Sequence, residues 1–559
     1  MKVKLKKLAT LVLALLMLPI LYAPASAVDE DPTIRIGLYY GSSAMPSANL
    51  ENYSGSGYYF GWWNSAYEFV SVGYTSQTTI TTMKDKNMYL SSGLYYDTPT
   101  AASYSTIGAY HLQLNTVYGS FEEASSVASS YSNAFPAYIN GEYRVRIGNY
   151  TSTDSAYSAA SSLGISGQTT VVGMSSTCYT VTVTGTTTIL FEFDYGTRTA
   201  FGIDPDITGV NNNETWFKGY RYYGGFEYKR LSGNDITVIN YVSIHDYVKG
   251  ILPYEMSASW PIEALKAQAL CAKSYTLCNL NKHSASGFDL CNTTDCQVYR
   301  GTSSATSNSD KAVDDTYGLY VLYNGSPAQT FYFSSDGGAT EDSINVWSSD
   351  LPYLKGVIDP YEETISIPGY TWEYTYTTEQ LTWLLNQKGY TIGNIVNCYV
   401  SKTTNTGNVY SVTFVDSSGK VLSLNREAAR TVFYSATLGY TTTSQRFTIT
   451  ANYEGNGTNV YVNNASSTIS SLNGAYAING SGSIGTIDGD TAYAVTDSGN
   501  QTVTASGTSG ETPVSFTVSG KGSGHNVGMS QWGAYAMASQ GMTYDQIIKF
   551  YFTGVTIGR

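Results

Sequence analysis

One segment of the chain has the spacing of a long amphipathic helix, and it constrains the fold class more than any other. In the run SWPIEALKAQALCAKSYTLCNLNKH, Ile262, Leu265, Ala269 and Ala272 recur at helical spacing and predict a surface that faces a core. Pro261 suits the first turn of such a helix, where its missing N–H is not needed. Much of the remaining chain alternates apolar and polar residues with the period of two that is typical of strands. We therefore expect an α+β protein.

The length of 559 residues predicts several domains rather than one core. Residues 28–107 form an expected β-rich N-terminal region, and 185–235 form a second β-rich region that connects to a main domain at 236–559. Within the main domain, the stretch 446–518 is poor in charge and rich in Asn, Gly, Ser and Thr, which predicts an antiparallel β insertion.

The N-terminus has the order of a secretory signal peptide. The lysines of MKVKLKK precede the apolar run LATLVLALLMLPILYA, and the small residues ASA follow and end at Ala27. The run is short for a membrane span, which favours removal over an uncleaved anchor, and no later stretch is long and apolar enough to span a bilayer. We expect residues 1–27 to be removed and the mature chain to be secreted.

The net charge of −13 makes nucleic acid and anionic lipid unfavourable partners, because like charges repel at long range. Tyrosine is abundant, with 51 residues, whereas only 13% of residues are charged. A tyrosine ring has an apolar face and a hydroxyl, which suits the surface of a sugar. The strand propensity of tyrosine accounts for most of this abundance.

Residues 108–184 contain two copies of a strand, turn and helix pattern. The copies are AYHLQLNTVYGSFEEASSVASSY and EYRVRIGNYTSTDSAYSAASSLG, and each helix follows a Ser, Thr or Asp cap. Two such units predict a small domain with helices on one face of a sheet. The segment, RVRIGNYTSTDSA above all, resembles the SPOR domain (sporulation-related repeat), a family that binds peptidoglycan glycan strands without stem peptides. An unrelated ferredoxin-like module is the alternative.

Five blocks in the main domain carry a second resemblance. They are YVKGILPYEMSASWPIEALKAQALCAKSYTL, FDLCNTTDCQVYRG, YFSSDGGATED, PYLKGVIDP and GHNVGMSQWGAYAMASQG. In this order they resemble the family of stage II sporulation protein D, also called SpoIID/LytB, over about 236–555. The resemblance implies a lytic transglycosylase that acts on peptide-free glycan strands. Some members are described instead as enhancers of a cell-wall amidase.

Glu255 is the expected catalytic acid. Its neighbours in LPYEM are apolar and Trp260 follows closely, so the charged form of the carboxyl is disfavoured and its pKa is raised, as a general acid requires. One carboxyl suffices in a lytic transglycosylase, because the C6 hydroxyl of the muramic acid replaces the water nucleophile. The resemblance places the catalytic acid of the family on Glu255. The alternative is a carboxylate near a helix N-terminus, a role that Glu263 fits better.

Five further residues are candidates for handling the substrate. Lys273 stands where the family usually has Arg, which keeps the charge but loses the bidentate fork, and Lys355 in PYLKGV is comparable. His525, Gln531 and Trp532 lie in the motif GHNVGMSQWG, whose glycines permit close approach of the backbone to a ligand. Trp532 could stack on a sugar and His525 could hydrogen-bond one. A packed Trp and a satisfied core His are the alternative.

Cys291 and Cys296 lie in FDLCNTTDCQVY, and His283 precedes them. Thiolates and imidazole are suitable zinc ligands. Some members of the resembled family bind zinc with cysteines and a histidine in this place, although Asp295 here stands where relatives often have His. We expect a structural zinc held by Cys291, Cys296 and either His283 or Asp295. A Cys291–Cys296 disulfide in an oxidising exterior is the alternative.

The sequence and its resemblances thus predict a secreted, cell-wall-associated lytic transglycosylase. Its partner is the glycan strand, which it would cleave between MurNAc and GlcNAc to leave a 1,6-anhydro-MurNAc end. The alternative is a non-catalytic, glycan-binding enhancer of an N-acetylmuramoyl-L-alanine amidase. An adhesive surface protein is a third hypothesis, but it draws only on the Tyr- and Thr-rich β regions.

Overall fold

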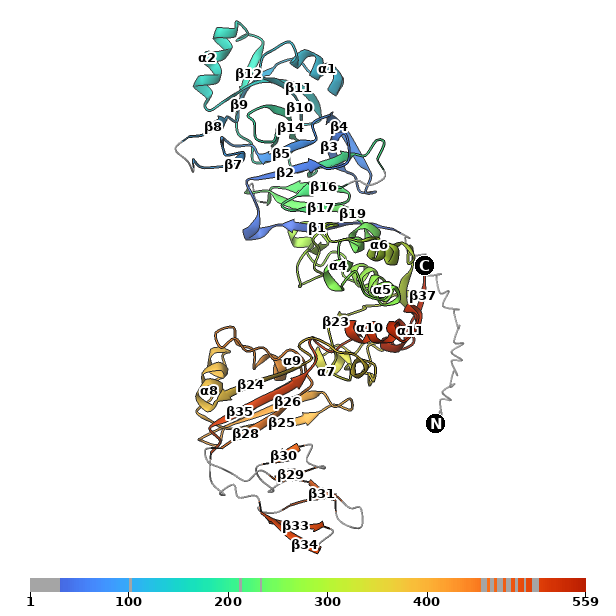
Figure 1. The fold of residues 1–559 in the computed structure, drawn as a ribbon. Helices are drawn as coiled ribbons and strands as arrows, with labels where there is room; N and C mark the ends of the chain where they lie inside the picture. The colour runs from blue at the N-terminus through green and yellow to red at the C-terminus, as the bar shows by residue number, and fades with distance from the viewer. Residues whose placement is uncertain are drawn as a thin grey trace, which may run out of the picture.

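The structure is a computed structural model of the chain, and it shows an elongated α+β protein, as expected (Figure 1). Sheets from the first half of the chain lie at one end, a layer of helices lies in the middle, and an insertion lies at the other end. The structure describes residues 31–559 except 100–102, 211–213, 232–233 and several short segments between 454 and 511.

One sheet joins the first strand of the described chain to strands of the main domain. Its strands, in order, are β20 (Leu290–Cys291), β1 (Thr33–Tyr39), β19 (Thr237–Ser243), β18 (Gly225–Lys229), β15 (Phe201–Asp206), β3 (Gly57–Trp63) and β4 (Phe69–Thr75). The regions 28–107 and 185–235 therefore interleave with the main domain instead of preceding it. Local alternation predicts a strand but not its partner, because ladder hydrogen bonds join segments at any sequence separation.

A second sheet has ten strands in the described part of the chain. They are, in order, β12 (Thr169–Val172), β9 (Tyr110–Leu114), β11 (Glu142–Tyr150), β10 (Ala134–Ile139), β14 (Ile189–Asp194), β13 (Tyr179–Val183), β5 (Thr79–Lys84), β2 (Ser47–Asn52), β16 (Thr215–Phe217) and β17 (Tyr220–Tyr222). The first four, with helices α1 (Phe121–Ala128) and α2 (Thr153–Leu163), form an antiparallel βαββαβ module. Ser120 and Ser152 cap the two helices, as the repeat predicts.

This module is continuous with the rest of the sheet. Strand β10 pairs in parallel with β14, which lies beyond residue 184. Glu192 of β14 is fully buried and pairs with two residues of the module, Arg146 Nη1 at 2.7 Å and His111 Nε2 at 3.1 Å. A buried carboxylate without partners would be costly, so this network ties the segment 108–184 to its neighbours.

The helical layer is built around α5 (Ile262–Cys278). The surrounding helices are α3 (Ile244–Lys249), α4 (Leu252–Glu255), α6 (Ser307–Asp314), α10 (Gln531–Ser539) and α11 (Tyr544–Tyr551). Helix α5 packs against α6, α10 and α11, so nearly all its side chains from Ala264 to Thr276 are buried. The sequence predicts only one core face, because helical spacing does not reveal neighbours on the other sides. Pro261 is the N-cap residue of α5 rather than part of its first turn.

Short elements bring the C-terminal segment onto this layer. Strand β21 (Tyr320–Tyr323) pairs with β22 (Ser326–Pro327) and with β37 (Thr556–Gly558), and β23 (Tyr332–Phe333) runs parallel to β36 (Met529–Ser530). The remaining short elements are η1 (Gly41–Ser43), β6 (Met88–Ser91), β7 (Leu94–Tyr96), β8 (Ser105–Ile107), η3 (Ser284–Ser286), α7 (Ser343–Val346) and η4 (Glu362–Thr364).

The insertion has its own core, in which Phe414, Phe433 and Phe516 are fully buried. Its elements are β24 (Thr371–Thr377), α8 (Thr378–Gln387), β25 (Ile395–Thr403), β26 (Val409–Asp416), β27 (Val421–Asn425), α9 (Glu427–Thr431), β28 (Phe447–Asn452) and β35 (Ser515–Lys521). Antiparallel hairpins follow β28: β29 (Val460–Val462) with β30 (Ser467–Ile469), β31 (Tyr476–Ile478) with β32 (Ile484–Thr486), and β33 (Thr491–Thr496) with β34 (Gly499–Thr504).

The insertion therefore begins at β24, well before the predicted start at 446, because β24 pairs along its whole length with β35. Part of the predicted range 446–518 lies outside the described residues, as does the predicted signal peptide at 1–27. Among the described residues, no helix has the length and apolar character needed to cross a membrane.

Candidate active site

Glu255 is the last residue of the short helix α4, which packs on the core through the fully buried Leu252. Its carboxyl is partly buried and accepts a hydrogen bond from the Val298 N–H at 3.3 Å. Burial raises the pKa of Glu255 above its usual value, and the Val298 N–H and the Gln531 amide offset part of that rise. The structure thus gives Glu255 the environment that its apolar neighbours predict.

Gln531 comes from the far end of the sequence and lies beside Glu255. It is the first residue of α10, whose N-cap is Ser530, and the Ser530 hydroxyl accepts from the Gly533 N–H at 3.1 Å. The Gln531 side chain is 8% exposed, and its Nε2 forms no well-aligned hydrogen bond among the described residues, although the amide lies near enough to the Glu255 carboxyl to lower its pKa. The amide can therefore interact with Glu255 and also donate to an oxygen of a ligand.

Three aromatic residues cluster next to these two. The rings of Trp260 and Trp532 lie 4.6 Å apart between centroids, and Tyr535 lies 5.0 Å from Trp260 and 5.5 Å from Trp532. All three are partly exposed. Partly exposed aromatic faces suit the apolar face of a sugar ring. The prediction named only Trp532, although the position of Tyr535 one helical turn later was a usable signal.

Tyr332 also adjoins Glu255, and sequence reasoning missed it. Burial, and then the nearby Glu255 carboxylate, raises the pKa of Tyr332. Its hydroxyl donates to Gln297 Oε1 at 3.0 Å, and Gln297 Nε2 donates to Thr276 of α5 at 2.9 Å. This chain of hydrogen bonds fixes the segment before Val298, which donates to Glu255.

The His525 ring packs among aromatic side chains. Its ring lies against Phe331, Phe333 and Trp347, and Nδ1 accepts from the Val527 N–H at 3.2 Å. Burial lowers the pKa of His525 to about 3, so the ring is neutral. The role of His525 in binding a sugar stays a prediction.

The glycines of the motif GHNVGMSQWG permit close packing within the protein. A Cβ atom on Gly528, which has a φ of +85°, would lie 2.1 Å from the Phe331 carbonyl oxygen. At Gly528 the backbone therefore lies close to the Phe331 backbone, just before strand β23.

The two predicted lysines, Lys273 and Lys355, contact other parts of the protein. The Lys273 ammonium is buried and donates to the carbonyl and hydroxyl of Thr316, and burial lowers the pKa of Lys273 to about 7. Lys355 pairs with Asp350 at 2.6 Å and with Asp342 at 3.6 Å, and the Asp350 carboxylate raises its pKa. The structure does not bring either lysine into the group formed by Glu255, Gln531 and the aromatic cluster.

The predicted metal ligands lie close together in space. Donor atoms of His283, Cys291, Asp295 and Cys296 all lie within 4.8 Å of one another. His283 Nε2 is 3.3 Å from Cys296 Sγ and 3.1 Å from Asp295 Oδ2. Cys291 and Cys296 are free thiols in the structure. One imidazole, two thiols and one carboxylate are a suitable tetrahedral donor set for zinc.

This cluster is joined directly to the environment of Glu255. Cys296 is followed by Gln297, which bonds Tyr332, and by Val298, whose N–H donates to the Glu255 carboxyl. The position of the cysteine loop therefore controls a hydrogen bond to the predicted acid.

Glu362 holds the loops behind the site. Its buried carboxylate accepts from the N–H groups of Asp336 and Gly337, at 2.8 and 3.0 Å, and from the hydroxyls of Ser335 and Ser530. Ser530 directly precedes Gln531, so this carboxylate fixes the residue that faces Glu255. No local pattern predicts the role of Glu362, because its partners come from two segments remote from it in the sequence, 335–337 and Ser530.

Asp336 and Asp359 lie with Glu362 in a group of buried carboxylates. Burial and the neighbouring carboxylates raise the pKa of Asp336 well above its usual value. Tyr551 of α11 donates its hydroxyl to Asp359, which attaches the last helix to the same loops. We call the segments 335–341 and 359–363, together with Ser530, the frame.

Comparisons with known proteins identify the family to which this region is similar. The profile of the SpoIID family, described as stage II sporulation protein, matches residues 232–323, which include Glu255, Cys291 and Cys296. An uncharacterized protein of Brachyspira hyodysenteriae is 30% identical over 341 residues, which cover 61% of this chain and 73% of that protein. The chain belongs to the stage II sporulation protein D family.

Two relatives from Bacillus subtilis have descriptive names. The amidase enhancer is 32% identical over 314 residues, 56% of this chain and 40% of that protein. Stage II sporulation protein D is 26% identical over 331 residues, 56% of this chain and 74% of that protein.

We predict that Glu362→Gln lowers the free energy of unfolding by roughly 1–3 kcal/mol, because an amide group would replace an acceptor oxygen that faces donors. Urea unfolding measures this loss. Glu363→Gln is the matched control, since the neighbouring Glu363 is exposed and its substitution should change stability by less than about 0.5 kcal/mol. A Glu362→Gln protein as stable as its parent would contradict the conclusion that the Glu362 carboxylate holds these loops together.

Proposed function

We propose that this protein is a secreted peptidoglycan lytic transglycosylase that cleaves peptide-free glycan strands, with Glu255 as the catalytic acid. The observation that carries the proposal is the partly buried Glu255 carboxyl with a raised pKa, beside the buried Gln531 amide. The names of the relatives, which refer to sporulation and to an amidase enhancer, support a role at the cell wall.

In the proposed reaction, protonated Glu255 donates its proton to the glycosidic oxygen between MurNAc and GlcNAc as that bond breaks. The C6 hydroxyl of the same MurNAc attacks its anomeric carbon, and the Glu255 carboxylate accepts the hydroxyl proton. Glu255 ends as it began, no water is consumed, and the products are a 1,6-anhydro-MurNAc end and a free GlcNAc hydroxyl.

The neighbouring residues have roles that follow from their chemistry. Gln531 Nε2 can donate to a sugar oxygen beside the scissile bond, because it lies beside Glu255 and forms no well-aligned hydrogen bond among the described residues. Trp260, Trp532 and Tyr535 offer ring faces on which a sugar can stack. The Val298 N–H stabilises the carboxylate form of Glu255 after proton transfer.

A non-catalytic enhancer of a cell-wall amidase is the second candidate, because the amidase enhancer of B. subtilis is among the relatives. The two functions differ in their products. A transglycosylase releases 1,6-anhydro ends from glycan alone, whereas an enhancer changes only the rate at which an amidase releases peptides.

We also propose that Cys291, Cys296, His283 and Asp295 hold a structural zinc. When bound, the metal would fix the loop that leads to Val298. This loop is rich in Asn, Thr and Asp, so a metal can order it where a core cannot. Proton transfer by Glu255 needs no Lewis acid, which favours a structural role.

The βαββαβ module at 108–184 is proposed as a glycan-binding domain of the SPOR type. The strand order β12-β9-β11-β10, with both connecting helices, is the observation that supports it. Because its sheet continues into β14, the module is best tested within the intact chain.

Glu255→Gln should keep the fold and lose cleavage by a factor of roughly 10² to 10⁴, since the amide is nearly isosteric but cannot donate a carboxyl proton. Mass analysis of products from peptide-free glycan strands measures the 1,6-anhydro ends. Wild-type activity should fall as pH rises through the raised pKa of Glu255, because the acid works only while protonated.

The matched control is Glu263→Gln, which changes a carboxylate in the first turn of α5 that pairs with Lys266. This protein should cleave normally. A folded and active Glu255→Gln protein would contradict the assignment of Glu255 as the catalytic acid. A wild-type protein that forms no 1,6-anhydro ends would favour the amidase enhancer.

Elemental analysis should find about one zinc per chain, and Cys291→Ser should remove it. Cys278→Ser is the control, because Cys278 lies outside the cluster and donates instead to the Pro327 carbonyl. With chelator and denaturant, both cluster thiols should become alkylatable. A Cys291–Cys296 disulfide in freshly purified protein would reject the zinc site.

Hydrogen–deuterium exchange on the intact Glu255→Gln protein should show protection of 109–172 when peptide-free glycan strands are added. Sacculi that retain stem peptides are the comparison and should protect this segment less. Protection confined to the surroundings of Glu255 would count against glycan binding by the module.

A further inference from the structure

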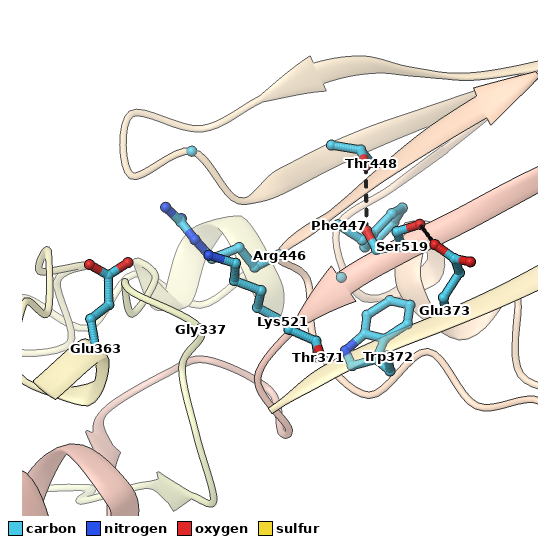
Figure 2. A pocket seen from close by; sticks show the side chains of 12 residues that line it. Gly337, Glu363, Thr371, Trp372, Glu373, Arg446, Phe447, Thr448, Ser519 and Lys521 are labelled. Carbon is cyan, nitrogen blue, oxygen red and sulfur yellow. Dashed lines mark hydrogen bonds between the residues drawn. The ribbon is translucent and has the colours of Figure 1, made fainter. Parts of the chain in front are cut away.

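A cavity of about 730 Å³ lies where the frame behind the active site meets the insertion. Gly337 and Glu363 line it from the frame, and residues of β24, β28 and β35 line it from the insertion (Figure 2). It shares no lining residue with the group around Glu255, so it needs a separate explanation.

Two cations line this cavity, Arg446 and Lys521. Both lie between Glu363 on one side and Trp372 on the other (Figure 2). Arg446 is anchored by a bond from Nη1 to the Thr406 carbonyl at 2.9 Å. Among the described residues, neither cation forms an ion pair with a carboxylate, so both charges remain available to an anionic ligand. Arginine suits a carboxylate in particular, because its planar fork can donate two parallel hydrogen bonds.

The Trp372 ring is held in place beside the cations. Its Nε1 donates to the Gly522 carbonyl at 3.2 Å, and its ring lies over Gly520, where a Cβ would approach within 2.2 Å. A ring fixed in this way loses little entropy when a sugar stacks on it.

Acceptor and hydroxyl groups complete the lining. Glu363 and Glu373 present carboxylate oxygens, and Glu373 accepts from the Ser519 hydroxyl at 2.7 Å. Thr371 and Thr448 add further hydroxyls. A simple anion would be repelled by these carboxylates, whereas the hydroxyls of a sugar can donate to them. The set as a whole therefore fits a sugar that carries one acidic group.

The wall around this cavity is preorganised. The buried Glu341 accepts from Thr404, Thr406 and Asn408 of the insertion, at 2.6, 2.6 and 3.1 Å. Thr406 is also the residue whose carbonyl anchors Arg446. The insertion and the frame are thus joined at the cavity by hydrogen bonds to a buried carboxylate, which are stronger than neutral ones.

We propose that this cavity is an accessory subsite for a muramic acid residue whose lactyl carboxylate is free, with Arg446 and Lys521 on the carboxylate and Trp372 against the sugar ring. The lactyl group is a neutral amide while a stem peptide is attached and an anion once the peptide is gone. Arg446 and Lys521 therefore select stripped strands. The identity of the polymer rests on the proposed function, but the carboxylate site itself does not depend on cleavage.

The test uses intact protein carrying Glu255→Gln, so that strands are bound and not cut. Two probes are compared: peptide-free glycan strands, and the same strands with their carboxylates converted to methyl amides. The parent should bind the free-carboxylate strands roughly tenfold more tightly, which is the scale of one charge-assisted contact. Arg446→Gln and Lys521→Gln should each remove most of this difference and leave binding of the amidated strands unchanged.

Lys402→Gln is the matched control, because Lys402 is a cation of the same insertion that packs over the Tyr410 ring. It should keep the preference. Arg446→Gln removes the hydrogen bond to the Thr406 carbonyl and could unfold the wall of the cavity. Lys521→Gln still tests the proposal in that event, because the Lys521 side chain is exposed. Equal preference in parent and variants, or equal loss with both probes, would overturn the subsite. Carboxylate-dependent binding without any 1,6-anhydro product from wild-type protein would instead reject only the proposed reaction.

Discussion

The carboxylate of Glu362 is the interaction on which the site depends. It is 1% exposed and accepts hydrogen bonds from Ser335, from the backbone of Asp336 and Gly337, and from Ser530. A buried carboxylate is tolerated only when its oxygens are satisfied, so these segments must meet around it. Since Ser530 begins the helix that carries Gln531, satisfying one buried charge also sets the geometry at Glu255.

The candidate active site is assembled by such long-range constraints. Glu255 ends a short helix, the Val298 N–H reaches it from the segment after the cysteine loop, and the Gln531 amide reaches it from the C-terminal helix. Helix α5 lies behind all of them and is buried on nearly every side. The partial burial that this scaffold gives the Glu255 carboxyl raises its pKa, because desolvation disfavours the charged form.

A second buried carboxylate joins the insertion to the rest of the protein. Glu341 ties Thr404, Thr406 and Asn408 to the frame that Glu362 organises. The cavity with Arg446, Lys521 and Trp372 therefore has a fixed position relative to the candidate active site. A glycan strand is a long polymer, so a second fixed contact would add to the affinity of the first without further ordering cost.

Local features could be predicted from the sequence alone. The spacing of Ile262, Leu265, Ala269 and Ala272 predicts α5, the caps predict α1 and α2, and the short separation of Cys291, Asp295 and Cys296 brings potential ligands onto one loop. Features that depend on remote segments could be found only in the folded chain. It placed Gln531 beside Glu255, grouped Trp260 with Trp532 and Tyr535, buried Lys273 against Thr316, and paired the first strand with β19. The physical reason is that helical periodicity and capping act within a few residues, whereas strand pairing and the satisfaction of buried polar groups depend on partners that no local pattern names.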